Sequence, residues 1–168
     1  MKAEDSVLCI YRFIAVWRYR VLLPSGVFGS HLSIAGSMAN ALREARALKL
    51  DCVQVFTKNQ QQWRAPPLQD DAVREWKHEL KANGWADGSA NAAPGRAVAH
   101  SSYLINLASP NPELWAKSVD SMVIELERCE ALGIGALVHH PGSSTGAPAE
   151  VGLENIVRAY REIFARTR

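Results

Sequence analysis

Hydrophobic and polar positions follow two different periods along this chain, and the two periods alternate. Short apolar runs typical of buried strands occur at residues 27–31, 52–56, 97–99 and 136–139. Each run is followed by a longer segment in which apolar residues recur at helical spacing. The pattern therefore predicts four strand–helix units, which form a parallel sheet with right-handed crossover connections.

The expected helices carry recognisable end signals. Ser37 is the expected N-cap of the first helix, and the second helix begins near Asp70. The third helix is the clearest, because Asn111 precedes a first-turn proline and an apolar face continues as far as Gly133. A fourth amphipathic segment covers residues 153–164.

Four strand–helix units amount to half of an eight-stranded barrel. A (β/α)8 TIM barrel typically needs about 250 residues, whereas this chain has 168. We therefore expect an α/β fold of the TIM-barrel type in which residues 26–168 supply about the first four β/α units. Residues 1–25 do not resemble the rest of the chain and end at a Pro-Ser-Gly turn, so we expect them to form an N-terminal extension.

Composition narrows the classes of function only slightly. The formal net charge of +2 permits a nucleic-acid partner without indicating one. The three cysteines form no CxxC pair, which argues against a disulfide framework and a thiolate zinc site and suits a reducing cytoplasm. The apolar stretch 6–23 is interrupted by Arg12, Arg18 and Arg20, so we expect no membrane-spanning helix.

Histidines stand at the ends of the predicted strands, where parallel α/β folds place their active sites. His100 and His140 end neighbouring strands about 4.8 Å apart, so two inward imidazoles could reach one metal ion. A histidine near a strand end is more often simply hydrogen-bonded, and this alternative stays open. His31 is a weaker candidate, with a supporting role beside the metal ligands. His139 should point to the opposite face of its strand.

Two polar or exposed loops suggest contacts with nucleic acid. Amides in the loop 57–62 can bind phosphate oxygens, while Trp63 adds a stacking surface and Lys58 and Arg64 add positive charge. Tyr103 and Leu104 follow His100 where the chain must turn. They either pack over the barrel mouth or act as wedges that enter a base stack and hold DNA bent.

Four sequence blocks carry a resemblance to a known family. They are GSHLSIAG at 29–36, FTKNQQQW at 56–63, HSSYLINL at 100–107 and HPGS at 140–143. Together, in this order and each at a strand end, they resemble the endonuclease IV family of apurinic/apyrimidinic endonucleases. The resemblance extends from about residue 28 to the C-terminus.

The resemblance implies a (β/α)8 barrel with a trinuclear zinc site that cleaves double-stranded DNA 5′ to an abasic site and leaves a 3′-hydroxyl. By motif, His100 and His140 match two ligands of one Zn²⁺ ion. Tyr103 and Leu104 match the residues that enter the DNA at the lesion. Asn59 lies in the polar loop that faces the lesion.

The chain also departs from the family pattern. Gln61, another expected DNA contact, stands where a large basic residue is common, and Ser144 stands where a histidine often follows Pro-Gly-Ser. The bridging glutamate and the later Asp, His and Glu ligands of the family belong to strands that would follow residue 168. We therefore expect the 168-residue chain to be an inactive or truncated fragment that self-associates or needs the missing barrel half.

Two other classes of function stay open at this point. One is a non-catalytic DNA-binding or assembly module. The other is a sugar isomerase-like TIM barrel, which shares the fold and the preference for metals. An isomerase gives no reason for the Lys-Asn-Gln run at 58–60 or for the Tyr-Leu pair at 103–104.

Overall fold

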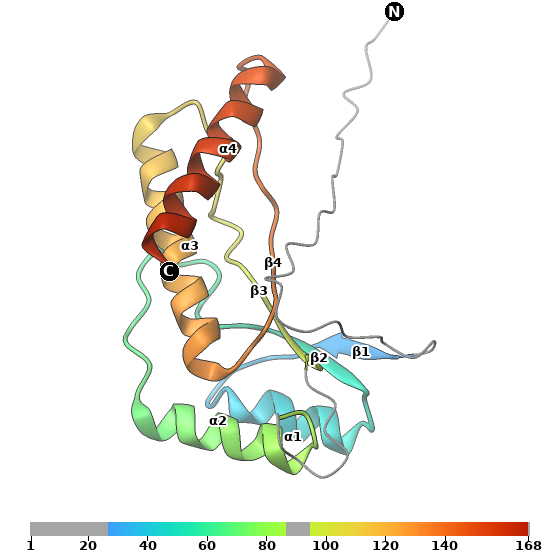
Figure 1. Ribbon diagram of the computed structural model, residues 1–168. Coiled ribbons are helices and arrows are strands. Elements are labelled where there is room, and N and C mark those ends of the chain that lie inside the picture. The colour runs from blue at the N-terminus through green and yellow to red at the C-terminus, as the bar shows by residue number, and fades with distance from the viewer. Residues whose placement is uncertain (1–26, 87–94, 168) are drawn as a thin grey trace, which may run out of the picture.

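The computed structural model describes residues 27–86 and 95–167, and within these ranges strands and helices alternate as the sequence predicts (Figure 1). The elements are β1 (Gly29–His31), α1 (Ala39–Ala47), β2 (Cys52–Phe56), α2 (Asp70–Ala82), β3 (Ala97–His100), α3 (Pro112–Leu132), β4 (Leu137–Val138) and α4 (Ala149–Arg166). The expected extension 1–25 and the apolar stretch 6–23 lie outside the described residues.

The strands form one parallel sheet whose spatial order is the order of the sequence, β1-β2-β3-β4. In the register, His31 lies opposite Gln54, Phe56 opposite His100, and His100 opposite Val138. A doubly wound sheet reverses its strand order part-way, whereas a TIM barrel adds each new strand beside the last. The order therefore confirms the predicted partial (β/α) barrel.

The helices cover one face of the sheet as two pairs. Figure 1 shows α1 beside α2 and α3 beside α4. Val53 and Val55 are buried in the same cluster as Leu42 and Trp76, so this face of β2 packs against the helices. Gln54 and the other alternate residues of β2 are only half-buried on the opposite face. In a complete barrel that opposite face is filled by layers of side chains.

Local signals fix both ends of α3. Asn111 Oδ1 accepts the Leu114 N–H at 2.9 Å, and Gly133 has a φ of 72°, so both predicted ends of α3 are confirmed. Met38, one residue after the expected Ser37, occupies the N-cap position of α1. The Ser37 hydroxyl instead accepts the Ala39 N–H and donates to Glu75 Oε2 at 2.7 Å, because α2 packs beside this turn.

Four predicted ranges differ from the observed elements, among them β3, which extends one residue past the expected 97–99 to His100. β1 begins two residues later than expected, β4 is shorter than 136–139, and α4 begins at Ala149 rather than near residue 153. β4 pairs with β3 through Leu137 and Val138, so hydrogen bonding defines a shorter strand than hydrophobicity does. Among the described residues, the helices are too short or too polar to cross a membrane.

Candidate functional site

A cluster of aromatic and imidazole rings lies at the carboxyl ends of the strands. His31 ends β1, Phe56 ends β2 and His100 ends β3, while Tyr103 and His140 follow β3 and β4. The His100 ring centroid lies 5.3 Å from that of Tyr103 and 5.4 Å from that of His140. Phe56 lies 5.7 Å from both His100 and Tyr103. The fold thus gathers residues from all four strand ends at one edge of the sheet.

His100 has the environment of a metal ligand. Its side chain is 8% exposed, and its Nδ1 lies 2.8 Å from the Ser101 carbonyl oxygen. Donation from Nδ1 to that carbonyl leaves Nε2 with its lone pair, the arrangement by which proteins orient ligating histidines. Burial lowers the pKa of His100, and the neighbouring His140 and His31 act in the same direction against the Ser101 hydrogen bond. The neutral imidazole that a metal requires is therefore favoured.

His140 complements this geometry from the next strand. It lies two positions beyond Val138, the residue paired with His100, so strand alternation puts both histidines on the same face. The His140 side chain is exposed and its ring is tilted by 54° to that of His100. The two imidazole side chains of His100 and His140 are of a type that binds zinc.

A third protein ligand does not join the pair within residues 27–86 and 95–167, where the structure brings no three His, Cys, Asp or Glu side chains close enough for a metal ion. His31 lies 6.4 Å from His100 between ring centroids, and its Nδ1 is 3.0 Å from Gln54 Oε1. His31 thus lies beside the pair, hydrogen-bonded within the sheet. Catalytic zinc sites usually use three protein ligands, so the two histidines alone do not make up such a site.

The expected DNA contacts lie beside the histidines on two adjoining loops, which we call the β2 loop (57–62) and the β3 loop (101–104). Asn59 and Gln61 are exposed, and Asn59 Oδ1 accepts the Gln61 N–H at 2.9 Å. Tyr103 is 64% exposed, although its ring also lies against those of Phe56 and His100. Leu104 beside it is half-buried. The loops therefore present these four side chains at the same edge of the sheet as the histidines.

The expected role of Lys58 as a phosphate contact is wrong. Its side chain is 1% exposed, donates to the Gln62 carbonyl oxygen at 2.7 Å and lies 3.8 Å from Glu125 Oε1. The ammonium group is therefore turned into the protein. The sequence could not reveal this, because Glu125 belongs to a distant helix.

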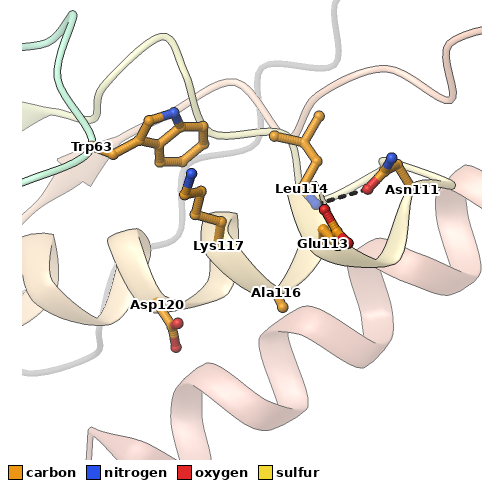
Figure 2. A pocket seen from close by; sticks show the side chains of 7 residues that line it. All are labelled: Trp63, Asn111, Glu113, Leu114, Ala116, Lys117 and Asp120. Atoms are coloured by element: carbon orange, nitrogen blue, oxygen red, sulfur yellow. Dashed lines mark hydrogen bonds between the residues drawn. The ribbon is translucent and has the colours of Figure 1, made fainter.

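Trp63 also has a partner that the sequence did not indicate. Figure 2 shows its ring beside Lys117, whose Nζ lies 5.3 Å from the ring centroid. The two residues line a groove of about 550 Å³ along α3 that also contains Glu113 and Asp120. The groove carries charges of both signs and includes neither histidine of the pair. One face of Trp63 is thus occupied by an ammonium group rather than free for stacking.

His139 faces the helix layer, as strand alternation predicts. Its Nε2 lies 2.6 Å from the Tyr160 hydroxyl of α4. Burial lowers the pKa of His139 and raises the pKa of Tyr160 to about 12. His78 is exposed on α2 beside Glu79. Neither histidine contributes to the cluster.

Comparison with known proteins adds a second line of evidence. The family model described as the xylose isomerase-like TIM barrel matches residues 42–168. The chain belongs to the xylose isomerase-like TIM barrel family. Within this family it is similar to the endonuclease IV proteins, which confirms the resemblance carried by the four sequence blocks.

Several family members are more than one-third identical to the chain over the aligned residues. A probable endonuclease 4 of Chloroflexus aurantiacus is 37% identical over 138 residues, which are 82% of this chain and 45% of that protein. A probable endonuclease 4 of Geotalea daltonii is 38% identical over 141 residues, or 83% of this chain and 46% of that protein. The chain spans about half the length of the curated relatives it matches.

A solved structure of the family agrees with the fold. The crystal structure of endonuclease IV from Thermus thermophilus superposes with a TM-score of 0.63 at 38% sequence identity. The match covers 79% of this chain and 45% of that protein. The arrangement of strands and helices in this chain therefore matches part of a solved TIM-barrel structure.

Proposed function

We propose that this chain supplies the part of a zinc-dependent DNA-repair endonuclease of the endonuclease IV type that recognises the lesion. Its substrate is double-stranded DNA with an abasic site, cleaved on the 5′ side to leave a 3′-hydroxyl. Residues 26–168 are the N-terminal half of the barrel, and residues 1–25 are an extension. Curated relatives that carry the endonuclease 4 name support this proposal over a sugar isomerase.

One observation carries the proposal. The rings of His100 and His140 lie 5.4 Å apart beside Tyr103, which is exposed although it is a large aromatic residue. A metal-ligand pair next to an exposed wedge suits an enzyme that bends DNA at a damaged step and cleaves the adjacent phosphodiester.

Each side chain has a role in this proposal. His100 and His140 would hold Zn²⁺, which when bound neutralises phosphate charge and lowers the pKa of coordinated water. Tyr103 and Leu104 enter the base stack at the lesion, where the missing base leaves less stacking to disrupt. The exposed amides of Asn59 and Gln61 contact the DNA backbone beside the wedge. His31, next to His100, supports the orientation of the ligands.

We further propose that the 168-residue chain has no appreciable cleavage activity alone. Glu150 and Glu154 are exposed on α4, which lies in the outer helix layer, so they cannot complete the metal site. The remaining ligands come from the missing barrel half or from a second copy of the chain. Large apolar side chains exposed on α4, Leu153 and Val157 among them, support such an association.

A second candidate function is a DNA-binding or assembly module without catalysis. The specific observation in its favour is that the described residues bring only two histidines of a metal site together. Such a module would use the same loops and would read lesions without cutting them. The two functions differ in one measurable respect. The nuclease gains cleavage activity when the remaining zinc ligands are supplied by another barrel half, whereas the module does not.

The proposal is tested by fluorescence anisotropy with the full chain and two labelled duplexes that differ only in one abasic site. Tighter binding to the abasic duplex across a salt series supports lesion recognition, because phosphate contacts alone treat both duplexes alike. Equal affinity for the two duplexes, or binding to neither, would overturn it. Cleavage after fusion to the downstream half of a relative separates the nuclease from the module.

A further inference from the structure

A buried carboxylate lies beneath the two loops of the proposed DNA-binding surface. Glu125 is on α3, and its side chain is 1% exposed. Its Oε1 accepts the Ser102 N–H at 2.8 Å, and its Oε2 accepts the Thr57 hydroxyl at 3.2 Å. Lys58 Nζ lies 3.8 Å from Oε1. One carboxylate therefore contacts both the β2 loop and the β3 loop.

Other hydrogen bonds reinforce this connection. The Ser102 hydroxyl donates to the Gln60 carbonyl oxygen at 2.7 Å, which joins the two loops directly. The same hydroxyl accepts the Leu104 N–H at 3.2 Å. Arg128, one turn after Glu125 on α3, donates to the Thr57 carbonyl oxygen through Nε at 2.9 Å. The ends of both loops are thus hydrogen-bonded to one another and to a single helix.

Stability alone is a poor explanation for a charged pair at this position. Burial raises the pKa of Glu125, and the Ser102 N–H, Lys58 and Thr57 oppose this rise only in part. Burial also lowers the pKa of Lys58. The raised pKa of Glu125 and the lowered pKa of Lys58 both mean that burial disfavours the charged form of the side chain. Apolar side chains of similar volume often serve a core as well or better, whereas directional hydrogen bonds fix a geometry.

We propose that Glu125 is a positioning residue that sets the separation between the β2 loop and the β3 loop. The separation matters because one loop carries Asn59 and Gln61 while the other carries Tyr103 and Leu104. A wedge enters a base step only if the backbone contacts hold the DNA at a matching distance. This inference rests on the proposed function for its consequence in DNA binding, but the linkage between the loops stands on the contacts of Glu125 alone.

The test compares Glu125→Gln with a matched control, Glu79→Gln. Glu79 is also a buried carboxylate that accepts hydrogen bonds from charged side chains, but its partners Arg43 and Arg46 are on α1, away from both loops. Glu125→Gln keeps the shape of the side chain while it removes the charge and replaces one acceptor by a donor. Thr57→Val, which removes only one donor to Glu125, is a milder second variant if Glu125→Gln does not fold.

The first measurement is hydrogen–deuterium exchange of the full chain without DNA. In Glu125→Gln we expect amide exchange to rise about fivefold or more in peptides that cover both loops, because each loses a hydrogen bond to a charged group. Glu79→Gln should change exchange in α1 and α2 and leave both loops as in the wild type. Loops that exchange like the wild type in Glu125→Gln and in Thr57→Val would overturn the proposal.

The second measurement is the ratio of dissociation constants for intact and abasic duplexes. We expect Glu125→Gln to reduce this ratio about tenfold or more, the effect of one lost hydrogen bond to a charged group, with affinity for intact duplex within about twofold of the wild type. Equal losses of affinity for the intact and the abasic duplex would show that Glu125 only stabilises the protein in general, and would overturn the positioning role. If the wild-type chain shows no preference for the abasic duplex, the proposed function is refuted. The hydrogen–deuterium exchange measurement then decides by itself whether Glu125 links the β2 loop to the β3 loop.

Discussion

Asn106 and Ser143 exchange two hydrogen bonds between the segments that follow β3 and β4: Asn106 Nδ2 donates to the Ser143 carbonyl oxygen, and the Ser143 N–H donates to Asn106 Oδ1, each at 2.9 Å. Leu107 N–H also donates to the Pro141 carbonyl oxygen at 2.9 Å. The segment after β3 therefore holds the His-Pro-Gly-Ser turn after β4. This contact keeps His140 beside His100.

The close approach of Asn106 predicts a specific sensitivity at Gly142. Gly142 has a φ of 111°, and a Cβ at this position would collide with the Asn106 side chain. Gly146 has a φ of 90° but open space around it, so Gly146→Ala is a matched control that introduces backbone strain alone. We expect Gly142→Ala to lower the free energy of unfolding by about 1–3 kcal/mol more than the control does, as backbone strain and overpacking add.

Urea unfolding followed by circular dichroism measures this difference. Equal losses in the two variants would show that Asn106 can move aside without cost.

The wedge assignment predicts a loss of lesion preference when Tyr103 and Leu104 are both replaced by alanine. We expect the preference for abasic over intact duplex to fall about tenfold, because a wedge acts through the deformed base step. Salt-dependent binding of intact duplex should persist, since phosphate charge supplies it. Fluorescence anisotropy at several salt concentrations measures both quantities.

The matched control is the double variant Phe28→Ala and Leu48→Ala. These residues are likewise an aromatic and an aliphatic side chain, both exposed, but they lie next to the amino ends of β1 and β2. An unchanged preference in the Tyr103 and Leu104 variant, or an equal loss in the control, would contradict the wedge.

The two-ligand site predicts weak zinc binding. We expect the purified chain to retain substoichiometric zinc after dialysis and to leave an abasic duplex uncut, because catalytic zinc usually takes three protein ligands. His100→Ala and His140→Ala should each weaken zinc binding further. His78→Ala, which removes an exposed histidine outside the cluster, should not.

Atomic absorption and a competition titration with a zinc-sensitive dye measure the metal, and gel electrophoresis measures cleavage. Zinc-dependent cleavage by the chain alone, abolished by His140→Ala, would refute this prediction and point to ligands from a second copy.

The contact between α1 and α2 predicts a pH-dependent contribution to stability. Burial opposes the charge on Glu79, but hydrogen bonds from Arg46 and Arg43 at 2.9 and 3.0 Å outweigh it and lower the pKa of Glu79. A lowered carboxyl pKa stabilises the folded state above the unfolded pKa, and this stabilisation is lost as pH falls through the folded pKa. We expect Glu79→Gln to cost about 1–3 kcal/mol at pH 7.

The cost should shrink as pH falls below the ordinary glutamate pKa of about 4.3, because the wild type then loses the same interaction. Urea unfolding of both proteins between neutral and acid pH measures the difference, with the exposed Glu44→Gln as control. A difference that stays constant with pH would show that the carboxylate charge is not what stabilises this contact.

The sequence by itself determined the alternation of elements and placed His31, His100 and His140 at or just after strand ends. The periods that distinguish strands from helices are local, and so are the Asn111 cap and the Gly133 end of α3, because each depends on backbone groups a few residues away. Parallel pairing then had to bring His100 and His140 to one edge of the sheet. The family followed from four short blocks at these same strand ends.

Only the tertiary structure decided which partners these side chains meet. Thr57 and Glu125 are 68 positions apart, and no local pattern indicates that a carboxylate on α3 draws Lys58 inward. Asn106 likewise meets Ser143 across 37 positions. Hydrogen bonds between distant segments depend on how whole helices pack against the sheet, and that packing determines which polar groups are buried together and must satisfy one another.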